Sequence, residues 1–175
     1  MAEKLIFLAG IHGVGKGYFS DFLSNVFDLE AYSASALIKA EKKRPVDHSK
    51  IAVDPEQNQD LLVAAFSRIK SEYEIALLDG HFVLMSDSGY FEVPIDTFRT
   101  LDIDLIILKT LDVDSIHSRL LGRDGESPGK AVLEEMQARE ESRALHVARQ
   151  LSIPIFQLKS DDFASSTEII SSYLK

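Results

Sequence analysis

The sequence predicts a three-layer α/β sandwich built on a five-stranded parallel sheet. Two observations lead to this class: apolar, strand-like runs alternate with helix-like segments, and a glycine-rich loop stands between the first strand and the first helix. Parallel strands joined through helices require right-handed crossovers, which place helices on both faces of the sheet. Because the chain shows no internal repeat, low-complexity tract or linker, we expect residues 1–175 to form a single domain.

Five short, mostly apolar runs are predicted to form strands. In chain order they span residues 4–9, 29–32, 74–79, 103–109 and 153–158. The run at 74–79 ends in a carboxylate, Asp79, and the run at 4–9 leads directly into the glycine-rich loop. Short apolar runs of this kind, bounded by polar residues, are typical of strands in the interior of a sheet.

Most of the sequence between these runs is predicted to be helical. The expected helices span residues 16–26, 33–43, 54–73, 113–121, 130–151 and 161–174. Phe19 and Leu23 show the spacing of one helix face in the first, and Asp54 followed by Pro55 suits the start of the third. Residues 122–129 are rich in Gly, Ser, Asp and Pro and are expected to form a loop.

Composition excludes several classes of protein. A chain of 175 residues that is 45% hydrophobic can bury one good core. Its net charge of −9 disfavours a duplex-DNA binder that depends on neutralising phosphates. The absence of cysteine excludes disulfides, thiolate zinc sites and cysteine nucleophiles. No signal peptide follows Met1 and no apolar run could cross a bilayer, so we expect a cytoplasmic protein without a membrane partner.

The segment Gly10–Lys16 reads G-I-H-G-V-G-K and carries most of the functional information. Its glycines allow backbone conformations closed to other residues, so successive N–H groups can point at phosphate oxygens from the positive end of the following helix. Lys16 then lies where an ammonium group can reach the outer phosphates. The spacing matches G-x-x-x-x-G-K, with Gly17 in place of the final Ser or Thr. The alternative is a glycine-rich turn that binds no ligand.

Other candidate residues follow the third predicted strand. Asp79 ends that strand and is the candidate for holding Mg²⁺, directly or through water, beside the Lys16 loop. The alternative is an ordinary strand-end Asp that caps a turn. His81 could orient a phosphate, a water molecule or the acceptor, or it could be purely structural.

Arginines recur at helical spacing in the second half of the chain. Arg119 and Arg123 lie four residues apart at the mouth of the predicted loop, and Arg139 and Arg143 repeat the spacing on the next helix. Guanidinium groups can grip phosphates in bidentate fashion, and phosphoryl transfer needs several positive groups around the moving phosphate. The alternative is a set of solvated arginines paired with Glu134, Glu135, Glu140 and Glu141.

These motifs resemble the adenylate-kinase-like nucleoside monophosphate kinases, in which the loop commonly reads G-x-P-G-x-G-K-G-T. Gly17 after the lysine is then the family's usage, whereas His12 replaces the family's Pro and Tyr18 its Thr. Arg119-x-x-Gly122-Arg123 is similar to the family's lid entry. Asp79-Gly80-His81 is similar to the D-x-H of the compact atypical and archaeal adenylate kinases.

The resemblance implies a P-loop NTPase topology of the nucleoside monophosphate kinase type, with acceptor-binding helices at about 33–73 and a short lid at about 122–130. It implies that Arg119 lies over the ATP base and Arg123 on its phosphates. The implied catalytic residues are Lys16, Asp79, Arg123 and Arg143. The implied nucleotide-binding residues are Gly10, His12, Gly13, Val14, Gly15, Lys16, Gly17, Tyr18 and Arg119. The implied acceptor-binding residues are Ser33, Ser35, Lys50 and His81.

Three functions fit these expectations. The first is Mg²⁺-dependent transfer of the ATP γ-phosphate to a nucleoside monophosphate. The second is phosphorylation of another small acceptor, or slow ATP hydrolysis, because the sequence gives the least information about which acceptor is bound. The third is a non-catalytic module whose nucleotide-dependent movement controls a protein partner.

Overall fold

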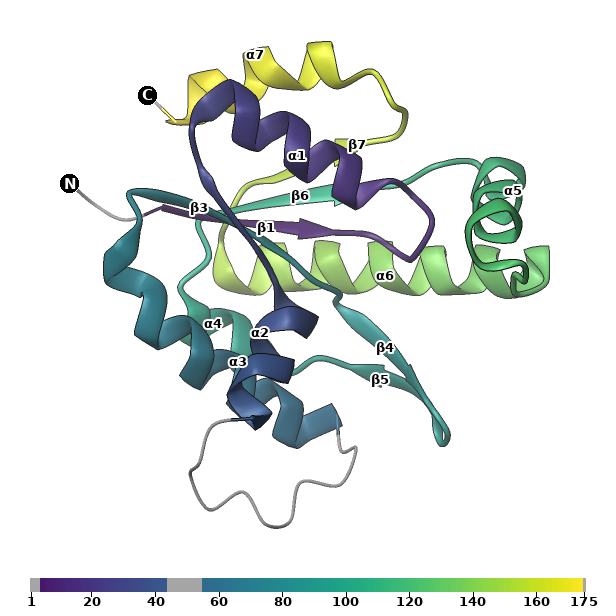
Figure 1. Ribbon diagram of the computed structural model, residues 1–175, viewed down its shortest axis with the longest axis horizontal. Coiled ribbons are helices and arrows are strands. Elements are labelled where there is room, and N and C mark those ends of the chain that lie inside the picture. The colour runs from purple at the N-terminus through teal and green to yellow at the C-terminus, as the bar shows by residue number, and fades with distance from the viewer. Residues whose placement is uncertain (1–3, 44–54, 175) are drawn as a thin grey trace.

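The computed structural model describes residues 4–43 and 55–174, which form a central sheet between two layers of helices (Figure 1). The strands are β1 (Lys4–Ala9), β2 (Glu30–Ser33), β3 (Ile75–Asp79), β6 (Leu105–Lys109) and β7 (Ile155–Leu158). They are all parallel and lie in the order β2-β3-β1-β6-β7. The predicted fold class is therefore confirmed.

Helices cover both faces of this sheet (Figure 1). On one face lie α1 (Lys16–Phe27) and α7 (Phe163–Leu174). On the other lie α2 (Ala34–Lys42), α3 (Pro55–Ile69) with the short 3₁₀ turn η1 (Lys70–Glu72), α4 (Ile95–Leu101) and α6 (Lys130–Leu151). The remaining helix, α5 (Val113–Asp124), lies beyond the carboxyl ends of the strands, next to the N-terminal end of α6 (Figure 1).

The central strand β1 shows why the sheet must be covered on both sides. Leu5 and Phe7 pack into the core beneath α3, α4 and α6, whereas Ile6 and Leu8 pack into the core beneath α1 and α7. Side chains of a strand alternate between faces, so a strand that is apolar throughout buries both of them. The carboxyl end of β1 is thereby held rigidly at the edge where the glycine-rich loop begins.

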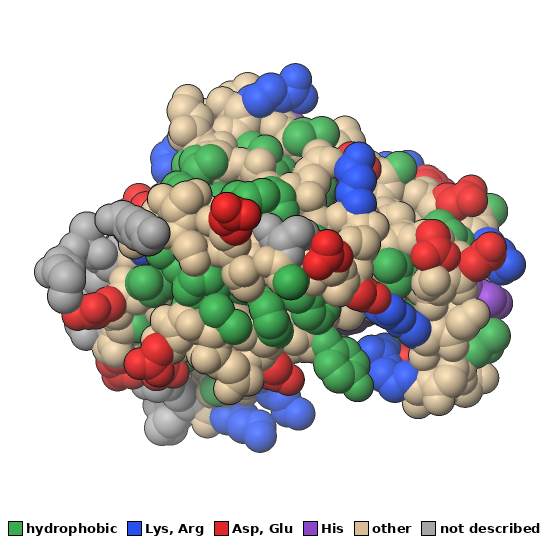
Figure 2. Space-filling model, turned by 90° about the horizontal axis from the view of Figure 1, so that it is seen from above, with side chains coloured by type: hydrophobic (Ala, Val, Ile, Leu, Met, Phe, Trp, Pro, Cys, Tyr) green, Lys and Arg blue, Asp and Glu red, His purple; other side chains and the backbone are tan. Residues whose placement is uncertain are grey.

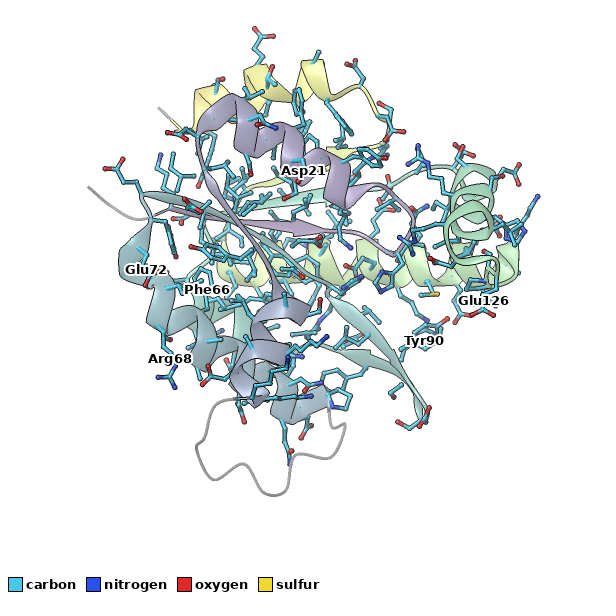
Figure 3. All side chains as sticks on the ribbon, in the orientation of Figure 1. Asp21, Phe66, Arg68, Glu72, Tyr90 and Glu126 are labelled. Atoms are coloured by element: carbon cyan, nitrogen blue, oxygen red, sulfur yellow. The ribbon has the colours of Figure 1, made fainter. Side chains whose placement is uncertain are left out.

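A hairpin and a short helix between Gly80 and Asp102 were not expected from the sequence. The strands β4 (Val83–Ser86) and β5 (Gly89–Glu92) pair antiparallel and form a separate two-stranded sheet. Each has only four residues and is half-exposed, so neither shows a strong hydrophobic period. Tyr90 of this hairpin lies under Arg139 of α6, with the guanidinium carbon 4.2 Å from the ring centre, which holds the hairpin against α6 (Figure 3).

The expectation that a helix ends at Leu121 and that a loop begins at Gly122 was wrong. Helix α5 continues to Asp124 and ends at Gly125, which adopts a left-handed conformation with φ 77° and donates its N–H to the Leu121 carbonyl. A glycine in this conformation is a common helix terminator, and Gly125 fills that role in place of Gly122. Arg123 therefore lies on the last helical turn, and the connection to α6 spans only residues 125–129.

Over the described ranges 4–43 and 55–174, no helix has both the length and the apolar character needed to cross a membrane.

Candidate functional site

The glycine-rich loop joins β1 to α1 and leaves the start of that helix open. Gly15 occupies the cap position with φ 91°, and no side chain of the described residues caps the first N–H groups of α1. Gly10 has φ 144°, and a Cβ atom at this position would collide with the Lys109 carbonyl of the neighbouring strand. Unsatisfied N–H groups at the positive end of a helix form an anion-binding site.

Lys16 is placed at the centre of this site. Its side chain is only 7% exposed, and its ammonium group donates a hydrogen bond to the Gly10 carbonyl. The same nitrogen lies 3.5 Å from Asp79 Oδ1 and 3.2 Å from His81 Nε2. Burial lowers the pKa of Lys16 and raises the pKa of Asp79, while their mutual attraction opposes both shifts. The structure thus brings together Lys16, Asp79 and His81, three residues that the sequence singled out separately.

Two imidazole rings stand beside the lysine. The ring centres of His12 and His81 are 4.8 Å apart. Burial, followed by the nearby Lys16 charge, lowers the pKa of His81 to about 2 and also lowers the pKa of His12. Both rings are therefore neutral at pH 7. Because the Lys16 ammonium donates to Nε2 of His81, we assign the His81 proton to Nδ1, where it can donate to a ligand.

Two cavities meet at these residues. The loop cavity, of about 790 Å³, is lined by Gly13, Gly15, Gly17, Tyr18, Arg119 and Arg123. The α2 cavity, of about 580 Å³, is lined by Ser33, Ser35, Lys39, Lys42 and His81. Both cavities share His12, Lys16 and Asp79 in their walls. Ligands in the two cavities would therefore meet at the Lys16 ammonium group.

Charge is distributed unevenly around this site. The chain carries a net charge of −9, and acidic side chains are scattered over the face of the molecule seen from above (Figure 2). Lys and Arg side chains gather beside a hollow on the same view (Figure 2). The wall of the loop cavity holds three cations and three carboxylates, whereas the wall of the α2 cavity holds four lysines and one carboxylate, Asp79. A locally basic cavity in an acidic protein favours a small anionic ligand over an extended polyanion.

Arg119 is held in place by an ion-pair network that the sequence did not reveal. One guanidinium nitrogen pairs with Asp161, and another donates to the Val14 carbonyl at 3.4 Å. Asp161 also accepts a 2.8 Å hydrogen bond from Lys109, whose side chain is fully buried. A lysine at the end of an apolar strand and an aspartate just after the last strand were the available signals. Their pairing connects the ends of β6 and β7 and could not be inferred from the spacing of residues in the sequence.

The remaining predicted site residues have different surroundings. Arg123 lines the loop cavity but is 61% exposed and paired with Asp124. Arg143 donates to the Val93 carbonyl at 2.8 Å and lies 3.1 Å from Glu92, and it lines neither cavity. Lys50 lies outside the described residues. The structure therefore does not bring Arg143 to the other site residues.

Gly10 and Val14 contribute through their backbones. The Gly10 carbonyl accepts from Lys16 and the Val14 carbonyl from Arg119. Neither residue is in the wall of the loop cavity. The Val14 side chain is buried in a small apolar cluster with Ile116 and Leu120 of α5, which fixes the loop against that helix.

Glu140 is the main structural residue of the site that the sequence did not identify. Its side chain on α6 is 1% exposed. It accepts hydrogen bonds from the N–H groups of Gly10 at 3.3 Å, Phe82 at 2.9 Å and Val83 at 2.8 Å. Burial raises the pKa of this carboxyl, and the three N–H groups oppose that rise. Glu140 thus ties the first residue of the glycine loop to the turn that carries His81.

The residues present fit Mg²⁺ held together with a nucleotide. Among the described residues there is no group of three His, Cys, Asp or Glu side chains that could hold a metal ion. Asp79 offers one carboxylate, 27% exposed, that both cavities share. Mg²⁺ in phosphoryl-transfer sites is commonly bound by one or two carboxylates, by phosphate oxygens and by water. Tyr18 is 81% exposed and does not supply the hydroxyl of the general motif.

Comparison with known families places this site in context. The model of the AAA domain family matches residues 9–138, which include the glycine loop, Asp79 and all of α5. The chain belongs to the AAA domain family. No curated protein matches it significantly in sequence.

Two solved structures share the fold of this AAA domain. A protein from Chloroflexus aurantiacus J-10-fl, described as a "putative kinase", has a TM-score of 0.59 at 16% identity and covers 99% of this chain and 96% of its own. An uncharacterized protein from Eubacterium ventriosum ATCC 27560 has a TM-score of 0.56 at 11% identity and covers 98% of both chains. At such low identities the likeness establishes the α/β P-loop fold alone.

Proposed function

We propose that this AAA domain is an ATP-dependent phosphotransferase, and that its acceptor is a small phosphorylated molecule, with nucleoside monophosphates as the first candidates. The observation that carries the proposal is the meeting of two cavities at Lys16, His12 and Asp79. A site that only binds or hydrolyses a nucleotide needs one such cavity. A transferase needs a second one that opens onto the same phosphate.

ATP would occupy the loop cavity with its phosphates against the amides of the glycine loop and its base toward Arg119. Mg²⁺, held through Asp79, would neutralise charge on the β- and γ-phosphates. The acceptor would occupy the α2 cavity, with its phosphate near Ser33, Ser35 and His81.

The reaction is an in-line displacement. An acceptor phosphate oxygen forms a bond to the γ-phosphorus, the bond to the β–γ bridging oxygen breaks, and ADP leaves with the electron pair. An ionised phosphate is already a nucleophile, so no general base is required. The contribution of the protein is positioning and charge neutralisation, which Lys16 and the loop amides provide.

A second candidate is a kinase for another small acceptor, or a slow ATPase. Two observations favour it: the Tyr18 side chain, which stands where the family has Thr, is largely exposed, and among the described residues no arginine lines the α2 cavity. A nucleotide-dependent binding module is the third alternative.

A screen of the purified protein with ATP, Mg²⁺ and a panel of monophosphates, in which ADP formation is followed, separates these three functions. ADP formed only with an acceptor supports a kinase, ADP formed equally without one supports an ATPase, and ATP binding without ADP supports a module.

Replacing Asp79 by Asn is expected to raise the Mg²⁺ concentration needed for half-maximal activity by about tenfold, because the amide keeps the shape but loses the charge that attracts the cation. Binding of ATP without metal should change much less. Titrating Mg²⁺ against turnover measures the effect. Asp21→Asn is the matched control, because Asp21 lines the same cavity from α1 (Figure 3). Superimposable Mg²⁺ curves for Asp79→Asn and the parent would remove Asp79 from the metal site.

The connection 125–129, together with the last turn of α5, is proposed to act as the lid, closing over bound nucleotide. Amide exchange in this segment should then slow on adding ATP together with the acceptor, and less with ATP alone. Arg123→Ala should lower turnover about tenfold with little change in thermal stability, because an exposed guanidinium contributes little to folding. Arg99→Ala, on the far helix α4, serves as the control. Exchange rates that no nucleotide changes, with full activity of Arg123→Ala, would contradict the lid.

A further inference from the structure

The α2 cavity carries a second cationic centre that the proposed transfer reaction does not use. One stripe of α2 faces this cavity: Ser35, Ile38, Lys39 and Lys42, at the spacing of a single helix face. Lys43, just after the helix, lines it as well. The N-terminal end of the stripe lies at the transfer point, because Ser33 is paired in register with Asp79 in the neighbouring strand. The lysines therefore mark the far end of the cavity.

The distance between the two ends follows from helix geometry. An α-helix rises about 1.5 Å per residue, so Lys39 lies about 6 Å and Lys42 about 10 Å beyond Ser35 along the axis. A monophosphate with its phosphate at Lys16 would present a neutral part of the molecule to these lysines. Three ammonium groups gain no charge–charge attraction from a neutral group, whereas an anion there would be attracted by all three.

Three features show that the lysine face is built into the fold. Helix α2 is fixed against α3 by Glu41, 3% exposed, which accepts a 2.9 Å hydrogen bond from Arg68. With the helix held in this way, Lys39 and Lys42 lie in the wall of the cavity. Within residues 4–43 and 55–174, no carboxylate forms an ion pair with Lys39, Lys42 or Lys43. The only carboxylate in the cavity wall over the same ranges is Asp79, at the opposite end.

A side-chain amide in the wall of the same cavity has an oxygen without a hydrogen-bond partner among the described residues. Asn58 of α3 lines the cavity, and its Oδ1 atom is buried with no hydrogen-bond partner among the described residues. A buried carbonyl oxygen without a hydrogen-bond partner is unfavourable, because it has lost its contact with water. Reorientation of this amide toward a bound ligand would relieve that cost, which adds a polar contact to the lysine face.

We infer that the acceptor carries a second anionic group, about 6–10 Å from the phosphate that receives the γ-phosphoryl group, and that Lys39 and Lys42 bind it. This inference rests on the proposed function only for the identity of the group near Lys16, which is the phosphate that accepts the γ-phosphoryl group. The shared chemistry is a small molecule with two anionic groups, whether a nucleoside bisphosphate or a sugar bisphosphate. Among small phosphorylated acceptors, those with this second anionic group would then be preferred over simple monophosphates that lack it.

Two matched pairs of compounds test the inference on the full chain: adenosine 5′-monophosphate with adenosine 3′,5′-bisphosphate, and glucose 1-phosphate with glucose 1,6-bisphosphate. Binding is measured by calorimetry in the presence of a non-hydrolysable ATP analogue, and KM is measured where turnover occurs. For at least one pair, the parent should bind the bisphosphate about tenfold or more tightly than its monophosphate. The pair that shows the preference identifies the source of the second anion.

The double variant Lys39→Gln/Lys42→Gln should lose most of that preference and keep its affinity for the ATP analogue, while Lys70→Gln, on a lysine paired with Asp102, should keep both. Equal affinity of the parent for both members of both pairs would overturn the inference, as would a preference that the double variant retains. Because calorimetry needs no turnover, a preference observed without catalysis would support the anion site and count against the proposed function alone.

Discussion

Replacing Lys16 by alanine is expected to lower turnover at least a hundredfold. Among the described residues, the Lys16 ammonium group is the one Lys or Arg cation that both cavities share, so it can follow the phosphoryl group from donor to acceptor. Loss of such a contact to the transferring group costs about 3 kcal/mol of transition-state stabilisation, which is about a hundredfold in rate. A coupled assay of ADP formation at saturating ATP and acceptor measures it.

The effect on folding should be small by comparison. Removal of a buried ammonium group leaves the Asp79 carboxylate without its partner, but Asp79 is partly exposed and can be hydrated. Thermal unfolding of Lys16→Ala is therefore expected to remain cooperative. Lys70→Ala, a surface change far from both cavities, is the control for the assay. Equal turnover of the Lys16 variant and the parent would show that Lys16 does not act on the transferring phosphate.

Replacing Glu140 by alanine is expected to destabilise the protein by about 3 kcal/mol, because the change leaves three backbone N–H groups at the site without their acceptor. For a chain of this size, that corresponds to a fall of about 10 °C in Tm. Glu140→Gln should show a smaller loss, since it keeps one acceptor oxygen but turns an NH₂ group toward the same donors. Denaturant unfolding gives the free energies.

The matched control is Glu134→Ala, on an exposed position of the same helix, which should change stability by less than about 0.5 kcal/mol. Glu140→Gln, if it folds, should also raise the KM for ATP, because Gly10 begins the phosphate loop. Wild-type stability of Glu140→Ala would mean that water replaces the carboxylate without cost. In that case Glu140 would not position the loop.

The sequence was sufficient to predict the central sheet. The three inner strands β3, β1 and β6 are largely continuous apolar runs, whereas the edge strands β2 and β7 contain polar residues and are less buried. The loop motif then indicated which edge of the sheet holds the site. The hairpin β4–β5 was missed because its strands are short and only half-buried, so local sequence carries little information about them.

The structure brings together those predicted site residues whose placement depends on local sequence, while their functional roles stay predictions. Lys16 and its glycines act through one loop, and Asp79 and His81 follow one strand, so their placement could be inferred. Glu140 and Asp161 could not be identified, because each acts through partners on other elements that only the tertiary fold brings close.

Arg143 shows how spacing alone can suggest a site residue whose surroundings in the structure are different. Its helical spacing from Arg139 matched the expectation for a phosphate-binding residue, but the Val93 carbonyl and Glu92 occupy its guanidinium group in this structure. The two acceptors belong to the hairpin region that sequence analysis did not predict. Its role in catalysis remains a prediction, and it would require the side chain to leave these partners.

The most direct test of phosphoryl transfer between the two cavities follows the γ-phosphate itself. The protein is incubated with Mg²⁺ and ATP labelled in the γ-phosphoryl group, with each acceptor of the mono- and bisphosphate panel, and the labelled products are separated. If the phosphoryl group passes from ATP to the acceptor at Lys16, the label should appear in the acceptor and very little of it in inorganic phosphate. In Lys16→Ala, neither product should become labelled. Label that appears only in inorganic phosphate, at a rate that no acceptor changes, would contradict it.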